Sequence, residues 1–101
     1  MTLTKNKLPE VWADVLASVS DFTEIQQQSF DVISSGQNGL ATSPTGTGKT
    51  LAYLLPSLLK VKKKQGQQLL ILAPNSELAG QIFEVVKSLA EPLSLSANLI
   101  I

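Results

Sequence analysis

The chain has 101 residues, of which 44% are hydrophobic and 16% charged, and its formal net charge is zero. This length allows one small domain, and the balanced charge provides no overall attraction to nucleic acid or to an anionic membrane. The absence of cysteine excludes disulfides and thiolate zinc sites, and the absence of histidine removes the commonest general base. We therefore expect a soluble globular domain in which any nucleic-acid site is local.

The chain shows no sign of a signal peptide or a membrane span. Its first residues, MTLTKNKLPEVW, contain no apolar core of the kind that a signal peptide needs. The longest apolar run, LAYLLPSLL, is half the length of a membrane span and contains Pro56. We expect a cytoplasmic protein that has no membrane partner.

Apolar periodicity predicts four helices. Residues 9–19 carry apolar side chains at 11, 12, 15, 16 and 19, the spacing of an amphipathic helix with proline in its first turn. Further helices are predicted over 23–34, over 49–60, and from a cap at Asn75 or Ser76 to the stop at Glu91–Pro92. The side chains expected to be buried are Ile25, Phe30, Val32 and Ile33 in the second helix and Leu78, Ile82, Val85, Val86 and Leu89 in the fourth.

Short apolar runs between these helices predict strands. The runs lie at 40–42, 69–73 and 99–101, and the second is continuously apolar, as a buried parallel strand is. Strands that alternate with helices form right-handed crossovers around a parallel sheet. The expected fold class is therefore α/β, a parallel sheet with flanking helices.

Residues 43–50, SPTGTGKT, match the phosphate-loop pattern G-x-x-x-x-G-K-[ST] except at the first position, where Ser43 replaces glycine. The glycines let successive N–H groups point at phosphate oxygens, and the following helix adds its positive end. Lys49 is expected between the β- and γ-phosphates and the Thr50 hydroxyl on Mg²⁺, which makes these two the catalytic candidates. An incidental glycine-rich turn is the alternative. The nucleotide-binding candidates in the loop are Ser43, Pro44, Thr45, Gly46, Thr47, Gly48, Lys49 and Thr50.

The stretch FTEIQQQSF, residues 22–30, places three glutamines at a predicted helix start. Thr23-x-x-Gln26 fits a capping box, in which each side chain accepts a bond from the other residue's N–H. If the helix and the strand after it are antiparallel neighbours, they return the chain to one level, and Gln26 is then also expected near the phosphate loop. Its amide carries the donor and acceptor that the N6 and N7 edge of adenine requires. Gln27 and Gln28 are expected to face solvent.

Three segments together resemble a known family. TEIQ at 23–26, SPTGTGKT at 43–50 and PNSELAGQ at 74–81 are similar to the Q motif, motif I and motif Ia of the DEAD-box ATP-dependent RNA helicases. The resemblance covers about residues 12–89. It implies a P-loop NTPase whose residues 1–101 are the N-terminal portion of the first RecA-like lobe, with Q-motif helices at 9–34 and an incomplete sheet.

The resemblance also implies roles for single residues. Gln26 would contact adenine with support from Thr23, and Trp12, the upstream aromatic residue, would stack on the base unless it simply packs in the core. Pro74, Asn75, Ser76 and Glu77 would contact the sugar-phosphate backbone of RNA. The implied partners are ATP with Mg²⁺ and single-stranded or short duplex RNA.

Two departures limit the RNA contact and the activity. Ser76 occupies the position of an arginine in the family motif, so a charge-assisted phosphate contact is missing, and helix capping is the alternative role of 75–77. The run of Lys60, Lys62, Lys63 and Lys64 is interpreted as a solvated loop. None of the eight acidic residues ends an apolar strand and no arginine is present, whereas hydrolysis requires a Walker B Asp-Glu pair and usually an arginine finger.

We therefore expect a truncated piece of an ATP-dependent RNA helicase that binds ATP and does not hydrolyse it alone. Three other classes stay open. They are a DNA helicase of RecQ or related type, a P-loop kinase of small molecules, and a non-catalytic ATP-binding module. A downstream D-E-A-D or D-E-x-H sequence would distinguish a helicase from the others.

Overall fold

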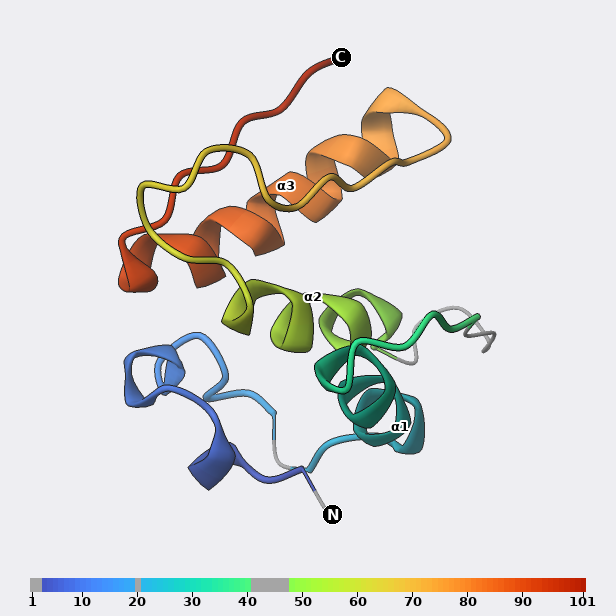
Figure 1. Cartoon of the computed structure of the whole chain (residues 1–101), viewed down its shortest axis with the longest axis vertical. Coiled ribbons are helices and arrows are strands. Elements are labelled where there is room, and N and C mark those ends of the chain that lie inside the picture. Colours follow the sequence, from blue (N-terminus) through green and yellow to red (C-terminus); the bar gives the residue numbers. More distant parts are fainter. Residues whose placement is uncertain (1–2, 20, 41–47) are drawn as a thin grey trace. The chain divides into compact units, whose positions relative to one another are not determined.

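Figure 1 shows the computed structural model, which describes residues 3–19, 21–40 and 48–101. Within these ranges the chain forms helices α1 (Glu24–Ser34), α2 (Lys49–Leu59) and α3 (Ser76–Ala90). Single 3₁₀ turns lie at Lys5–Lys7, Glu10–Trp12 and Glu91–Leu93. The chain divides into two compact units, Met1–Lys60 and Val61–Ile101.

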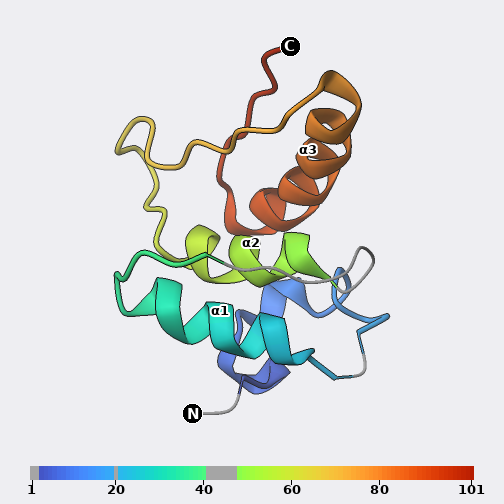
Figure 2. The ribbon, with the colours of Figure 1, turned by 90° about the vertical axis from the view of Figure 1, so that its right-hand side faces the viewer.

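The first unit is built on the packing of α1 against α2 (Figures 1 and 2). Helix α2 supplies four of the nine buried hydrophobic residues of this unit, because its sequence is apolar around nearly the whole circumference. The other five come from the residues before α1. The buried hydrophobic residues of this unit are Leu3, Leu8, Trp12, Leu16, Phe22, Ala52, Leu54, Leu55 and Leu58.

The helix predicted over 9–19 is wrong. In its place a 3₁₀ turn, Glu10–Trp12, is followed by separate turns, with Leu16 N–H donating to Trp12 C=O at 2.9 Å and Val19 N–H to Leu16 C=O at 3.0 Å. Trp12 and Leu16 are buried, but Val11 is 52% exposed, so the full apolar face of the expected helix is not covered. A short helix is marginal in water and forms only when tertiary packing covers one face.

The other three predicted helices are confirmed to within one residue at most ends. Helix α1 begins after its cap Thr23, α2 ends at Leu59, and α3 ends where Glu91–Pro92 follows. Burial within them differs from the prediction. The apolar side chains expected in the core of α1 are only partly buried, and its one buried residue is Gln26.

The predicted strands at 69–73 and 99–101 are absent. Neither segment is paired with another described segment, and Leu70, Leu72, Ile100 and Ile101 are each more than 80% exposed. Leu40 is likewise not in a strand, and the rest of 40–42 lies outside the described residues. An apolar run becomes a strand only when a neighbouring strand satisfies its N–H and C=O groups, so the sequence pattern alone does not create the sheet.

The second unit consists of α3, the 3₁₀ turn after it and the segments on either side. Asn75 caps α3, because its Oδ1 accepts a bond from Leu78 N–H at 2.8 Å. In Figure 1 the chain from about residue 66 to 75 runs alongside α3 before entering it. Among the described residues no helix is long and apolar enough to cross a membrane.

Candidate functional site

Gln26 joins the starts of two helices. Its side chain is 4% exposed. Oε1 accepts from Thr23 N–H at 2.9 Å, and Nε2 donates to Gly48 C=O at 3.2 Å. Thr23 Oγ1 accepts in return from Gln26 N–H at 3.3 Å, which completes the capping box. The predicted capping box is therefore present, and the first turn of α1 lies level with the residue that precedes α2.

Gly48 fits this arrangement because it has no side chain. It caps α2 with φ of +82°, in the left-handed region where residues with a Cβ are strained. A Cβ at this position would collide with Gln26 Nε2 and lie 3.3 Å from Gln26 Cδ. The close approach of Gln26 to the end of the phosphate loop therefore requires glycine here.

The amide of Gln26 keeps part of its bonding capacity. A glutamine amide offers two N–H donors and two acceptor positions on its oxygen, and the bonds to Thr23 and Gly48 use one of each. One donor and one acceptor are left, the same pair that the edge of adenine needs. Capping and contact with a base are thus compatible in hydrogen-bonding capacity, but at 4% exposure the amide would reach a base only after its surroundings had moved.

Two of the phosphate-binding candidates, Lys49 and Thr50, lie in the first turn of α2. Lys49 is its first residue and is exposed, and Thr50 follows, half-buried. First-turn N–H groups of a helix have no partner within the helix, so this end of α2 suits an anion. The predicted residues Ser43, Pro44, Thr45, Gly46 and Thr47 lie outside the described residues.

The Thr50 hydroxyl is hydrogen-bonded to Tyr53, one turn further along α2. Burial raises the pKa of the Tyr53 phenol, and the side-chain hydrogen bond with Thr50 acts in the opposite direction. The predicted role of Thr50 as a ligand of Mg²⁺ stays a prediction.

Trp12 lies in the core of the first unit with no exposed surface. This position agrees with the alternative that the sequence left open, core packing. A base could stack on its ring only after neighbouring side chains had moved, so stacking by Trp12 stays an untested prediction. A sequence pattern cannot separate these roles, because both place an aromatic residue at a helical spacing.

The motif Ia candidates Pro74, Asn75, Ser76 and Glu77 are all exposed at the start of α3. Asn75 Oδ1 is occupied by the cap, which confirms that this residue has a capping role. The N–H groups of Ser76 and Glu77 lie in the first turn, where helix geometry provides no partner. The site therefore offers backbone donors to a phosphate, with Glu77 as an opposing negative charge.

The other glutamines of the opening stretch differ from each other. Gln28 is exposed and donates to Glu24 Oε1 at 3.1 Å, so the prediction that it faces solvent is confirmed. Gln27 is partly buried and donates to Phe22 C=O at 3.3 Å, so the same prediction for Gln27 is wrong. Sequence spacing missed this contact because Phe22 lies in the segment before the helix, whose path the helix period does not describe.

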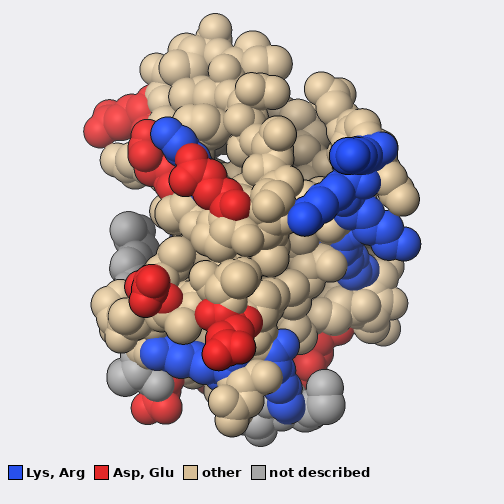
Figure 3. All heavy atoms as spheres, turned by 90° about the vertical axis from the view of Figure 1, so that its left-hand side faces the viewer, with Lys and Arg blue, Asp and Glu red and all other residues tan. Residues whose placement is uncertain are grey.

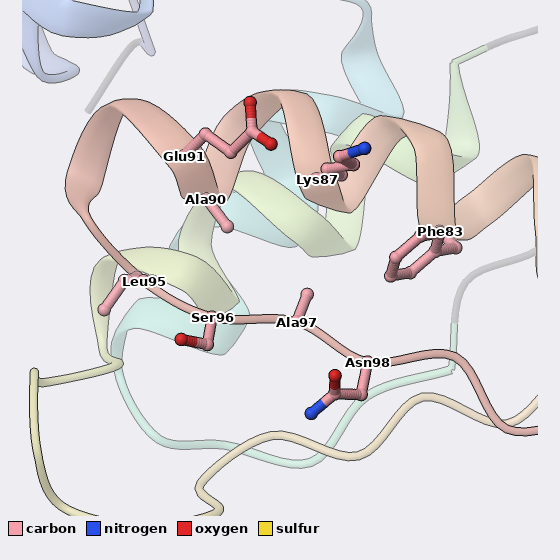
Figure 4. Close-up of a pocket in the computed structure, with 8 residues that line it drawn as sticks. All are labelled: Phe83, Lys87, Ala90, Glu91, Leu95, Ser96, Ala97 and Asn98. Atoms are coloured by element: carbon pink, nitrogen blue, oxygen red, sulfur yellow. The ribbon is translucent and has the colours of Figure 1, made fainter.

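A groove of about 360 Å³ lies in the second unit between the C-terminal half of α3 and the segment after it (Figure 4). Lys87 and Glu91 lie on the helix side, and Ser96 and Asn98 on the other. None of the predicted site residues lines it. The residues that the structure describes contain no group of three or more acidic side chains that could hold a metal ion.

Comparison with known proteins extends the motif evidence. Residues 23–101 match the family model described as DEAD/DEAH box helicase. The chain is 44% identical over 90 residues to the DEAD-box ATP-dependent RNA helicase CshC of Bacillus cereus, covering 88% of this chain and 23% of that protein. It is 50% identical over 66 residues to the probable ATP-dependent RNA helicase YfmL of Bacillus subtilis, covering 64% and 18%.

A human relative is named as a DNA helicase, unlike the two bacterial RNA helicases. The chain is 35% identical over 88 residues to the human ATP-dependent DNA helicase DDX31, covering 80% of this chain and 10% of that protein. The chain spans less than a quarter of the length of each of these three relatives. No solved structure matches it.

Proposed function

Because this chain belongs to the DEAD/DEAH box helicase family, we propose that it is part of the ATP-binding lobe of an ATP-dependent RNA helicase. The family implies a RecA-like P-loop fold. We further propose that the apolar runs at 40–42, 69–73 and 99–101 are strands of its parallel sheet when neighbouring strands are present to pair with them. The whole protein would use ATP to remodel or unwind RNA duplexes.

The observation that carries the proposal is the position of Gln26. A buried amide that bonds both to the start of α1 and to Gly48 brings the Q motif and the phosphate loop into one site. In this proposal the unused donor and acceptor of Gln26 contact the adenine edge, with Thr23 holding the amide in place. Local capping alone would not require the bond to Gly48, 22 residues away.

Lys49 and Thr50 serve the phosphates. In this proposal the Lys49 ammonium neutralises negative charge at the β- and γ-phosphates. The Thr50 hydroxyl would hold Mg²⁺, whose charge would offset that of the phosphates. Motif Ia, residues 74–77, contacts the RNA backbone through the start of α3.

Nucleotide selectivity tests the proposal. We expect the chain to bind ATP more tightly than GTP with Mg²⁺ present in isothermal titration calorimetry, and Lys49→Ala to abolish binding of both. Gln26→Ala should reduce the preference for ATP by about tenfold, since a lost pair of bonds to a base is worth roughly 1–3 kcal/mol. Gln28→Ala is the matched control, because it removes an exposed glutamine of the same helix. An unchanged preference in Gln26→Ala would show that Gln26 only caps α1.

A DNA helicase is the second candidate, because the human relative is named for DNA. The substrate is tested with RNA and DNA strands of one sequence. Equal affinity for both, or a preference for DNA, would favour this candidate over the RNA helicase.

A further inference from the structure

The lysine turn, which we define as Lys62–Lys64, is held in one conformation by a single side chain. Gln68 Oε1 accepts from Lys62 N–H at 2.9 Å, and Gln68 Nε2 donates to Lys62 C=O at 2.6 Å and to Gly66 C=O at 3.4 Å. The glutamine amide thus bonds to both backbone groups of Lys62, much as a paired strand would. These bonds favour the turn conformation that the structure shows.

The backbone of the turn is also unusual. Lys64 has φ of +61° and Gly66 φ of +73°, both in the left-handed region. For a residue with a side chain this conformation is strained, and glycine at position 64 would avoid the strain. The Gln68 bonds join residues on both sides of Lys64.

The three ammonium groups are available to an anion. Lys62, Lys63 and Lys64 are exposed, and no described carboxylate forms an ion pair with them. Figure 3 shows one cluster of lysines on this face and further lysines apart from it. A contact between one exposed lysine and one phosphate contributes little free energy of binding, because an exposed ion pair is weak. Measurable affinity therefore requires the three lysines to contact several phosphates at once.

Charge is segregated along the sequence although the total is zero. Residues 32–76 contain five lysines and no acidic residue, whereas the rest of the chain contains three lysines and all eight acidic residues. This segment includes the phosphate loop and the lysine turn. Within the second unit the three lysines of the turn carry this excess, which would attract a polyphosphate chain although the net charge of the whole chain is zero.

We propose that the lysine turn is a second contact for the sugar-phosphate backbone of RNA, separate from motif Ia and independent of base sequence. The choice of RNA rests on the proposed function. In Figures 1 and 2 the lysine turn lies closer to the C-terminal end of α3 than to its first turn, where motif Ia lies. The two contacts would hold an RNA strand at two places on one unit and lengthen its stay.

The test compares two triple variants that change net charge equally. One is Lys62→Gln/Lys63→Gln/Lys64→Gln. The other is Lys5→Gln/Lys7→Gln/Lys87→Gln, which neutralises the three lysines outside residues 32–76. Binding of a fluorescent single-stranded oligouridine RNA to the full chain is followed by anisotropy between about 50 and 200 mM salt. Circular dichroism establishes that both variants are folded.

We expect the lysine-turn variant to bind RNA at least tenfold more weakly at the lowest salt and the control variant to lose less than twofold. The slope of log affinity against log salt should fall by about 2 in the lysine-turn variant, since each phosphate contact on a single strand contributes about 0.7. Equal losses in both variants, or none in either, would overturn the proposal. Lysine-dependent binding to phosphatidylserine vesicles without binding to RNA would overturn it as well.

Two further measurements complete the test. Gln68→Ala keeps every charge and removes the bonds that fix the turn, so RNA affinity should fall roughly threefold, the cost of ordering the turn on binding. Unchanged affinity would refute the preorganised turn. ATP binding is measured on the same samples and should be normal in the lysine-turn variant. Failure of the wild-type chain to bind ATP would count against the proposed function and leave the RNA comparison intact.

Discussion

Gly48→Ala should destabilise the first unit in two separable ways. The left-handed backbone at φ of +82° costs a residue with a Cβ about 1–2 kcal/mol. The new Cβ would also displace the Gln26 amide, with loss of the Nε2 bond to Gly48 C=O, worth about 1 kcal/mol. We therefore expect the free energy of unfolding to fall by about 2–3 kcal/mol.

Gly36→Ala is the matched control for the backbone part. Gly36 has nearly the same φ, +81°, but a Cβ there meets nothing within 4 Å. Its substitution should cost only the conformational share, about 1–2 kcal/mol. Urea denaturation followed by the fluorescence of Trp12, the only tryptophan and fully buried, measures both variants in the same unit.

The contact itself is isolated in a double-mutant cycle. In a Gln26→Ala background the alanine side chain introduced at position 48 has no amide to displace, so Gly48→Ala should cost about 1 kcal/mol less than in the wild type. Gly36→Ala should cost the same in both backgrounds, because it does not touch Gln26. Additive effects of Gly48→Ala and Gln26→Ala would refute the inference that these two residues link the helix starts.

Two further predictions concern single interactions in α3 and α2. Asn75→Ala should lower the free energy of unfolding by about 1 kcal/mol through loss of the cap on Leu78 N–H, whereas Asn75→Asp should keep the cap. Thermal melts of both variants measure this, and equal losses of stability would contradict capping. The pKa of Tyr53 is raised, so its neutral form favours folding and stability should fall as pH rises from about 10 through the folded pKa. Tyr53→Phe should lose less stability than the wild type in denaturation series at rising pH, because phenylalanine does not ionise. An identical loss of stability in the variant would contradict this prediction.

Features that depend on neighbours in sequence were predictable. Thr23 and Gln26 form the expected capping box, and Asn75 caps α3, because such bonds join residues three apart on one turn of helix. Gln26 was expected near the phosphate loop from helix and strand rise, and its bond to Gly48 C=O agrees with that, but Leu40, the one described residue of the expected strand, is not in a strand. The order of three motifs, each with a stated physical role, was enough to indicate the family that the comparison then showed.

Features that depend on distant partners were not predictable in the same way. The segment 69–73 has the composition of a buried strand, yet Leu70 and Leu72 are exposed because no described segment pairs with it. The apolar spacing of 9–19 fits a helix, but only Trp12 and Leu16 are buried there and the backbone forms separate turns. Pairing and burial are supplied by other parts of the fold, which a local pattern does not contain.

The sequence by itself determined where α1, α2 and α3 begin and end and which motifs they carry, since caps, helix period and proline stops act within a few residues. Only the tertiary structure decided that Gln26 is the buried residue of α1 and that its amide reaches Gly48. It also decided that Gln68 fixes the lysine turn. These contacts depend on how the backbone folds back on itself, and a side chain with two donors and two acceptors has too many local partners for its sequence to choose among them.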